Sequence, residues 1–295
     1  MTELGMKKII MVSAFIVSLL SAGIVHAAEI KVGVMAPRGA LKTMKRWGEL
    51  GKYLAAEVGS PVKIVPLKPG ETVEAVSNGS VAYMLSNPVL AVALKHKLGA
   101  ETLVTMNKKS GKEFAGVIFS KKGSGISKAA DLKGKKVMGF KFKRSAAAYV
   151  FQVKHLMDQG INPHKDFAVF KEAKKQDDIV LAVKSGIFDA GFVKSGLIES
   201  MAKEGKVSMN DFTIIDQKSD SLSNVHSTAL YPEWCMSASK NANAGNKAKI
   251  KAALLKLVAA TPASKKAKIV GFVEPLSLAS LSGTLKSLKL PPFNQ

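Results

Sequence analysis

The sequence predicts an α/β protein built from two lobes that crossing strands join. Three observations support this class: short apolar runs alternate with helix-period segments, the alternation recurs in the second half of the chain, and no linker separates the halves. With 295 residues and 47% hydrophobic content, the chain is long enough to bury a core in each lobe. We expect the first lobe to take 28–118 and 227–295, and the second lobe to take 119–226.

The first expected lobe begins with a strand at 29–35 and a long helix at 41–58. That helix carries an apolar stripe at helical spacing, formed by Leu41, Met44, Trp47, Leu50, Leu54 and Val58. Strands are then expected at 62–66, 82–85, 103–105 and 114–119, and helices at 72–77 and 88–98.

The middle of the chain repeats this plan, and a glycine closes each of its helices. Strands are expected at 136–140, 189–193 and 212–216, and helices at 146–159, 177–184 and 196–203. The tail adds a strand at 234–237 and helices at 247–260 and 276–288. We expect the chain to cross between the lobes near Phe119 and again near Ser227.

The first 27 residues have the three-part pattern of a secretory signal peptide. Met6-Lys7-Lys8 is a basic start, an apolar segment runs from 9 to 25, and Val25-His26-Ala27 offers a cleavage site. The alternative, an anchoring transmembrane helix, needs about 20 apolar residues, and this segment is shorter. We therefore expect export to the periplasm, cleavage after Ala27 or Ala28, and no membrane anchor in the mature chain.

The charge is strongly positive, with 44 Lys and Arg against 22 Asp and Glu, a net of +22. Such a field attracts anions and raises their encounter rate. Nucleic acid is the obvious rival partner, but an export signal and the lack of a helix-turn-helix, zinc-finger or RNA-binding motif argue against it. Many lysines fall on polar helix sides or in turns, so a solvated basic surface accounts for most of the excess.

Signatures of catalysis are missing from the sequence. There is no Gly-x-Ser-x-Gly elbow, Walker loop or Gly-x-Gly-x-x-Gly fingerprint. Cys235 is the only cysteine, so the chain can form neither an internal disulfide nor a thiolate cluster, and its apolar neighbours indicate a buried thiol. The histidines that remain after cleavage (His96, His155, His164 and His226) lack metal-ligand spacing. We expect no enzymatic activity, no cofactor and no metal.

The side chains that point most clearly to a binding site lie at four turns, each between the end of a strand and the start of a helix. They are Arg38-Gly39, Ser86-Asn87-Pro88, Arg144-Ser145 and Lys194-Ser195-Gly196. Helix N-termini present unpaired N–H groups and a positive dipole end, and Arg binds two oxygens at once. In open α/β sheets the ligand crevice lies at the carboxyl ends of the strands. Each junction alone is explained by an ordinary helix cap, but the set predicts one shared oxyanion site.

A fifth feature, His226-Ser227-Thr228, places three polar side chains beside an expected crossing strand. The sequence leaves two interpretations open, a hinge between the lobes and a set of ligand donors.

Together these residues resemble the phosphonate-binding periplasmic component of ABC importers. They are closer still to the periplasmic sensor domains of that family on tetrathionate-type histidine kinases. The resemblance covers nearly all of the mature chain, and it rests on Arg38-Gly39, Ser86-Asn87-Pro88, Asp131-Leu132-Lys133-Gly134, Gly160-Ile161-Asn162-Pro163 and Asp189-Ala190-Gly191. Its most specific run is His-Ser-Thr-Ala-Leu-Tyr-Pro-Glu-Trp at 226–234.

The resemblance implies a type II periplasmic binding fold that closes on an oxyanion. It places ligand contacts at Arg38, Ser86, Asn87, Ser145, Lys194, Ser195, Gly196, His226, Ser227 and Thr228. To these we add Arg144 and Tyr149, which lie at the same helix start as Ser145.

The chain departs from the family pattern, and the differences suggest that it holds its ligand more by charged side chains and less by hydroxyl groups. The Ser-x-Ser/Thr-Gly helix start of phosphonate binders is Ser-Ala-Ala-Ala at 145–148, with three cations at 141–144. The His before an Asp is Gln176, and Lys194-Ser195-Gly196 stands where the sensor domains carry Arg-Thr-Gly.

The sequence thus predicts a monomeric periplasmic solute-binding protein that captures a small phosphorus or sulfur oxyanion for an ABC importer. The alternative in the same class is an accessory protein that presents the oxyanion to the periplasmic domain of a sensor kinase. An exported enzyme and a general polyanion-binding surface protein are the rivals from other classes.

Overall fold

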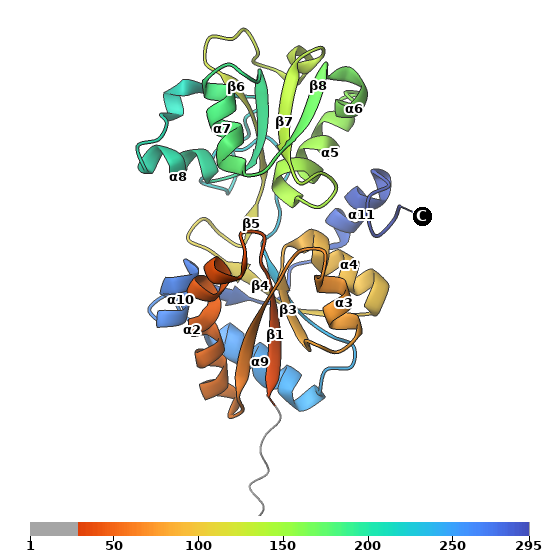
Figure 1. Ribbon diagram of the computed structural model, residues 1–295, viewed down its shortest axis with the longest axis vertical. Coiled ribbons are helices and arrows are strands. Elements are labelled where there is room, and N and C mark those ends of the chain that lie inside the picture. The colour runs from red at the N-terminus through yellow and green to blue at the C-terminus, as the bar shows by residue number, and fades with distance from the viewer. Residues whose placement is uncertain (1–28, 295) are drawn as a thin grey trace, which may run out of the picture.

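Two separate β-sheets divide the protein into two lobes, one above the other in Figure 1. The computed structural model describes residues 29–294, so the expected signal peptide and its cleavage site lie outside the described residues. The strand order is β13-β4-β12-β3-β1-β2 in the first sheet and β10-β6-β9-β7-β8 in the second. The predicted α/β class is confirmed.

The first lobe is a six-stranded mixed sheet with helices on both faces. Its strands are β1 (Ile30–Met35), β2 (Val62–Leu67), β3 (Tyr83–Ser86), β4 (Glu101–Asn107), β12 (Cys235–Ala238) and β13 (Gly271–Val273). Its helices are α2 (Ala40–Val58), α3 (Thr72–Ser77), α4 (Pro88–Leu98), α9 (Ala244–Lys256) and α10 (Pro262–Ala267). Apolar side chains of α2 and α9 form one core, and those of α3 and α4 form another on the opposite face.

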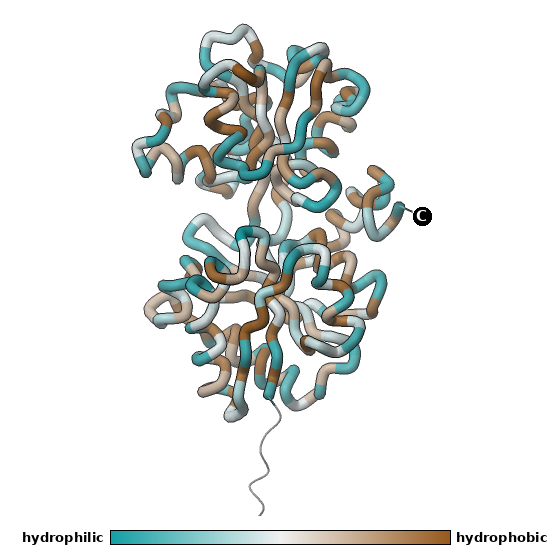
Figure 2. The backbone as a smooth tube through the Cα atoms, in the orientation of Figure 1, coloured by the Kyte–Doolittle hydropathy of each residue, from teal (hydrophilic) through white to brown (hydrophobic). Residues whose placement is uncertain are grey.

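The second lobe is a five-stranded sheet that is also covered on both faces. Its strands are β6 (Gly116–Lys121), β7 (Lys136–Phe140), β8 (Val169–Ala173), β9 (Ala190–Lys194) and β10 (Phe212–Ile214). Its helices are α5 (Phe151–Met157), α6 (Pro163–Asp166), α7 (Gln176–Lys184) and α8 (Leu197–Lys203), with short helical turns at Ala129–Leu132, Ala146–Val150 and Met209–Asp211. Figure 2 shows hydrophobic residues along the strands of both lobes and hydrophilic ones in the outer turns.

Two chain segments run side by side where the lobes join. β5 (Glu113–Phe114) pairs antiparallel with β11 (Tyr231–Pro232). Next to this pair, the amide of Ser227 donates to the carbonyl of Gly116 at 2.9 Å. The chain therefore crosses at about residue 115, upstream of the expected Phe119, and returns at Ser227 as expected. The residue limits of the two lobes at 118/119 and 226/227 remain a prediction.

A cluster of apolar side chains lies beside this hinge and belongs to both lobes. It combines Val89 and Val92 of α4, residues 146–153, and Leu281 and Leu285 of α11 (Ala279–Ser287). The ring of Phe151 stacks on that of Tyr231 at 4.0 Å between centroids. Figure 1 shows α11 at the level of the gap between the lobes.

Three details differ from the sequence-based expectations. The helix expected at 146–159 begins as a π-helical turn, because Ala147 and Ala148 have non-helical backbone angles. The helix expected at 247–260 is α9, which runs from Ala244 to Lys256, and a further helix, α10, follows it at Pro262–Ala267. Leu41 and Met44, the first members of the predicted stripe, are exposed rather than buried.

The Cys235 thiol is buried, as predicted. Burial raises the pKa of Cys235 to about 12, so the thiol is neutral at physiological pH. Within residues 29–294, every helix is either too short or too polar to span a bilayer.

The packing at the hinge predicts that a side chain at position 116 destabilises the protein. A Cβ atom there meets the side-chain amide of Gln152 at 2.5 Å. That amide is buried and donates to the carbonyls of Ala147 and Val193, both at 2.9 Å, so it has little freedom to move. We expect Gly116→Ala to lower the free energy of unfolding by about 1–3 kcal/mol, the usual cost of overpacking.

The measurement is thermal or urea unfolding, with Gly48→Ala as the control. Gly48 lies in α2 with only Met44 near its Cβ position, at 3.9 Å, so alanine there is expected to stabilise the helix slightly. Equal melting temperatures for Gly116→Ala and the wild type would contradict this account of the hinge.

Candidate anion-binding site between the lobes

Arg38 lies at the carboxyl end of β1, in the turn that leads to α2. Gly39 follows it with φ = 90°, a left-handed conformation that favours glycine, and α2 starts at the next residue. The Arg38 guanidinium is exposed and lies 3.8 Å from the Asp177 carboxylate in the first turn of α7. Since α2 and α7 belong to different lobes, this ion pair spans the space between them.

Lys194 is the last residue of β9 and pairs with Gly116 of the hinge strand. Its backbone amide donates to the side chain of Gln176 at 3.0 Å, which fixes the strand end against the start of α7. Burial first, and then the positive charge of Lys108, lower the pKa of Lys194 to about 8, while Glu233 opposes the shift. Arg46 and Arg38 add smaller depressions of the same pKa.

Glu233 is the carboxylate that faces these cations. Its side chain is 1% exposed and accepts a hydrogen bond from the Lys108 ammonium through Oε1. Oε2 accepts from the amide of Trp234 at 3.2 Å, and the Glu233 amide donates to the carbonyl of Lys112 at 2.9 Å. Both carboxylate oxygens are therefore engaged, and Glu233 is fixed beside the hinge strand.

Arg46 reaches the same region from the second turn of α2. Its Nε donates to the carbonyl of Ala267 at 3.0 Å, and its guanidinium lies 4.8 Å from the centre of the Trp47 ring. Burial lowers the pKa of Arg46, and Arg38 contributes in the same direction, whereas Glu233 raises it.

We call Arg38, Arg46, Lys108 and Lys194 with Glu233 the interlobe cation cluster. Four cations gather here with two carboxylates, Glu233 and the Asp177 that pairs with Arg38 from the other lobe, and three of the cations are partly buried. Burial is the main reason why the pKa values of Lys194 and Arg46 fall, and repulsion between the neighbouring cations adds to it. A bound anion relieves that repulsion, so this arrangement is suited to an oxyanion that touches both lobes.

Ser195, Gly196, Ser227 and Thr228 lie at the hinge, and their polar atoms bond to it. The Ser195 hydroxyl accepts from the amide of Ala115 at 3.2 Å, and Gly196 caps α8 in a left-handed conformation. The hydroxyls of Ser227 and Thr228 accept from the amides of Ile118 and Gly116, both at 2.9 Å. These bonds favour the hinge interpretation of this segment over the ligand-donor one.

His226 is fully buried in the loop that precedes the second crossing. Its Nε2 lies 3.0 Å from the Asp220 carboxylate, and its Nδ1 lies 3.0 Å from the carbonyl of Asn224. Both ring nitrogens therefore have partners within the loop.

The remaining predicted residues lie on the other side of the hinge. Ser86 is buried at the end of β3, and the Asn87 side chain caps α4 by accepting from the amide of Leu90 at 2.9 Å. Tyr149 is 2% exposed, and its hydroxyl lies 2.6 Å from Nε2 of His164 inside a group of aromatic rings. Within residues 29–294, these three residues form no hydrogen bond or ion pair with the interlobe cation cluster.

Arg144 and Ser145 lie in a strained turn at the carboxyl end of β7. Lys141 and Lys143 have φ of 42° and 66°, left-handed values that are uncommon for residues other than glycine. Arg144 is exposed, Ser145 is partly buried, and the Ser145 side chain makes no capping bond. Strained turns and π-turns are frequent at ligand sites, so Arg144 and Ser145 stay candidate contacts.

The sequence pointed to Arg38 and Lys194 as candidate contacts but not to Arg46, Lys108 and Glu233, which the structure places near them. Glu233 lies inside the most specific stretch of the family resemblance, and that position was a usable signal. Arg46 sits in the middle of a helix, and Lys108 is one of many lysines, so neither position marked it as a site residue.

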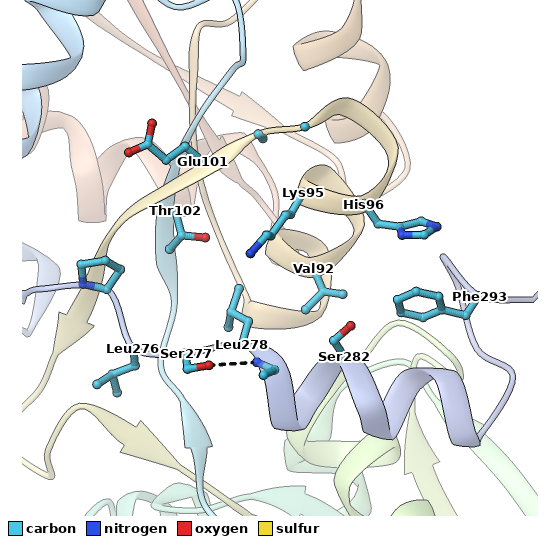
Figure 3. Close-up of a pocket in the computed structure, with 14 residues that line it drawn as sticks. Val92, Lys95, His96, Glu101, Thr102, Leu276, Ser277, Leu278, Ser282 and Phe293 are labelled. Atoms are coloured by element: carbon cyan, nitrogen blue, oxygen red, sulfur yellow. Dashed lines mark hydrogen bonds between the residues drawn. The ribbon is translucent and has the colours of Figure 1, made fainter.

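A separate recess of about 870 Å³ lies between α4, the start of β4 and the segment that leads into α11. Figure 3 shows Lys95 and His96 of α4 across from Ser282 of α11 and from Phe293. None of the residues that line it belongs to the interlobe cation cluster. In the part of the chain that the structure describes, no group of His, Cys, Asp and Glu is arranged to hold a metal ion.

Comparison with known proteins gives one family and several similar structures. The family described as "ABC transporter, phosphonate, periplasmic substrate-binding protein" matches residues 32–277. Tetrathionate sensor histidine kinase TtrS of Salmonella typhimurium is 30% identical over 218 residues, which is 72% of this chain and 37% of that protein. The chain therefore spans little more than a third of the length of this curated relative.

Two solved structures are similar in fold at 16% identity. PhnD1 from Prochlorococcus marinus, in complex with methylphosphonate, aligns over 88% of this chain and 98% of its own, with a TM-score of 0.70. XAC2383 from Xanthomonas citri, bound to ATP, aligns over 89% and 98%, with a TM-score of 0.72. These proteins confirm the predicted type II periplasmic binding fold.

The cluster predicts that Glu233→Gln destabilises the protein in the absence of ligand. The change leaves the Lys108 ammonium, which is 25% exposed, without its counter-charge, and we expect a loss of about 2 kcal/mol in the free energy of unfolding. Addition of sulfate or phosphate is expected to restore the melting temperature of this variant more than that of the wild type.

Glu274→Gln is the matched control, since its pair with Lys251 is exposed and contributes little. Loss of stability in Glu233→Gln without any recovery on anion addition would contradict an anion-binding role for the cluster.

Proposed function

The chain belongs to the phosphonate-type family of periplasmic substrate-binding proteins of ABC transporters, and from that premise we propose that it captures a small phosphorus or sulfur oxyanion for an ABC importer. The family consists of substrate-binding proteins rather than enzymes, and it is periplasmic. The single observation that carries the proposal is the interlobe cation cluster.

The chemistry of the cluster favours an oxyanion over a neutral solute. Arg38 and Arg46 have planar guanidinium groups that can bind two oxygens of a phosphoryl or sulfonyl group together. Lys108 and Lys194 supply compact ammonium charges. Since four cations here face two carboxylates, Glu233 and Asp177, a ligand with one or two negative charges fits the electrostatics of the site.

The same placement explains how binding is coupled to closure of the lobes. Lys194 belongs to the five-stranded sheet of the second lobe, whereas Arg46 and Lys108 lie in the first. Without an anion these like charges repel across the gap; with an anion between them the closed form is stabilised. The hinge strands at Gly116 and Ser227 then absorb the motion.

We place Arg38 and Lys194 first among the predicted ligand contacts and add Arg46 and Lys108. Arg144 and Ser145 remain proposed contacts from the second lobe, on the strained turn after β7. We assign Ser195, Ser227 and Thr228 to the hinge, and Ser86, Asn87, Tyr149 and His226 to the framework that supports the cleft.

The second candidate function is presentation of the oxyanion to a sensor histidine kinase. The observation that favours it is the similarity to TtrS, a protein named as a tetrathionate sensor histidine kinase. Both functions require the same cleft, and they differ in the protein that receives the closed form. The similarity to TtrS suggests a sulfur oxyanion as the ligand of this chain, and the similarity to PhnD1 suggests a phosphonate.

Ligand binding is tested by calorimetry with phosphate, methylphosphonate, phosphite, sulfate, thiosulfate and tetrathionate. For the tightest ligand, Lys194→Met and Lys108→Met are each expected to weaken binding by about 10- to 100-fold, because each removes a charge-assisted hydrogen bond. Lys171→Met, an exposed lysine of β8, is the control and is expected to leave the affinity unchanged.

Two outcomes contradict the proposal. One is wild-type affinity in both cluster variants. The other is affinity that collapses as salt is raised within the physiological range, because that dependence is typical of an open polyanion-binding surface.

The lowered pKa of Lys194 predicts a pH dependence of binding. An anion favours the ammonium form, so it binds most tightly below the pKa of about 8 and more weakly above it. For a ligand that does not itself titrate, such as sulfate, we expect the affinity to fall by up to about tenfold for each pH unit above 8.

Lys194→Arg is the control, because a guanidinium stays charged throughout this range. It is expected to bind with little change between pH 7 and 10. Parallel pH profiles in the variant and the wild type would exclude Lys194 as the titrating contact.

A further inference from the structure

An exposed apolar pair lies at the start of α2. Leu41 is 84% exposed and Met44 is 42% exposed, although both continue the stripe that buries Trp47 and Leu50 further along the helix. Thr43 and Trp47 in the same two turns are buried, so Leu41 and Met44 lie on the outer side of the helix. Exposed side chains of this size next to each other indicate a contact surface more often than a single exposed leucine does.

Cations surround this pair on α2 and on its neighbour α10. Lys42 and Lys45 lie on the same two turns of α2, and Lys265 and Lys266 lie on α10. The bond from Arg46 to the carbonyl of Ala267 holds the two helices together. All four lysines are exposed, and none takes part in an ion pair within residues 29–294.

Lysines of a neighbouring helix, in contrast, do have counter-charges. On α9, which packs against the same helix α2, Lys247, Lys251 and Lys256 each pair with a glutamate. The first turn of α2 contains no acidic residue, although acidic residues there are favoured by the helix dipole. The first two turns of α2 and the adjoining α10 therefore present positive charge that the chain itself leaves uncompensated.

The position of this surface relates it to the cleft. Arg38, the residue that pairs with Asp177 of the other lobe, lies one turn before Lys42. A partner seated on Leu41 and Met44 is thus placed at the edge of the cleft, where the distance between α2 and α7 changes when the lobes close.

We propose that Leu41, Lys42, Met44 and Lys45 of α2 with Lys265 and Lys266 of α10 form a docking surface for an acidic protein partner. Carboxylates of the partner pair with the four lysines, and an apolar side chain of the partner covers Leu41 and Met44. The inference rests on the proposed function in one respect, since a captured ligand has to reach a second protein.

A protein partner fits this surface better than a lipid membrane does. Membrane-binding helices present a continuous apolar face to the bilayer, whereas the apolar face of α2 beyond Met44 is buried in the core of its own lobe. Two exposed side chains within a ring of cations match the contact pattern of a protein interface, with an apolar centre and a charged rim.

The test is site-specific photo-crosslinking of the full chain in its native cells, with benzoylphenylalanine in place of Met44. The control position is Val258, an apolar residue that is 58% exposed elsewhere on the same lobe. We expect one protein adduct from position 44 and none from 258, with the crosslinked segment rich in Asp and Glu. The double change Lys42→Glu and Lys45→Glu is expected to reduce the adduct at least about tenfold, because like charges then face each other.

Adducts with lipid, with a second copy of this chain or with a segment that lacks acidic residues overturn the inference, as does the absence of any adduct. The double variant is expected to melt at or above the wild-type temperature, because acidic residues at a helix start are stabilising. Calorimetry separates the two proposals. If the double variant loses the adduct but binds the anion as tightly as the wild type, the docking surface is supported. If the wild type itself binds no anion, the proposed function is contradicted, and the crosslinking result still decides the docking surface.

Discussion

The repulsion among Arg38, Arg46, Lys108 and Lys194 is the constraint on which the rest of the account depends. The chain brings these cations together with two carboxylates, Glu233 and Asp177, and partly removes Arg46, Lys108 and Lys194 from water. A fold does not gain stability from such an arrangement, because desolvation and like charges both oppose it. This unfavourable arrangement is explained if an anion from solution binds among the cations and offsets their repulsion.

Because the cations lie on both sides of the hinge, their repulsion acts on the separation of the two lobes. Glu233 follows β11, and Lys194 ends the strand that pairs with Gly116, so the two residues lie on either side of the short crossing segment. The serine and threonine hydroxyls at 227 and 228 replace ordinary strand bonds there, which keeps the crossing ordered while only two chain segments join the lobes. Beside them, the apolar cluster of α4, α11 and residues 146–153 restrains the motion on one side. The geometry thus links the charge state of the cleft to the separation of the lobes.

Much of the fold was predictable from the sequence because its signals are local. The alternation of apolar runs and helix-period segments gave the strands and helices in order, and glycines marked where helices end. The site was less predictable, because it depends on contacts between distant segments. Arg38 and Lys194 could be named as candidates because one follows a strand and the other ends one, where α/β sheets place ligands. Arg46 joins them only because α2 packs on α10, and Lys108 only because its loop meets Glu233, 125 residues later. Leu41 and Met44 were expected to be buried but are exposed. An apolar stripe shows which face of a helix packs on the core, but it does not show how far along the helix the core extends.

The central claim is that an oxyanion binds directly to the interlobe cation cluster, and a crystal structure with selenate tests it most directly. Selenate has the shape and charge of sulfate, and the anomalous signal of selenium locates it without reference to the protein coordinates. We predict a selenium peak between the lobes with oxygens in hydrogen-bond distance of Lys194 and Arg46. A peak found only at the α4 or 146–150 helix starts, or no peak between the lobes at a saturating concentration, would contradict the claim.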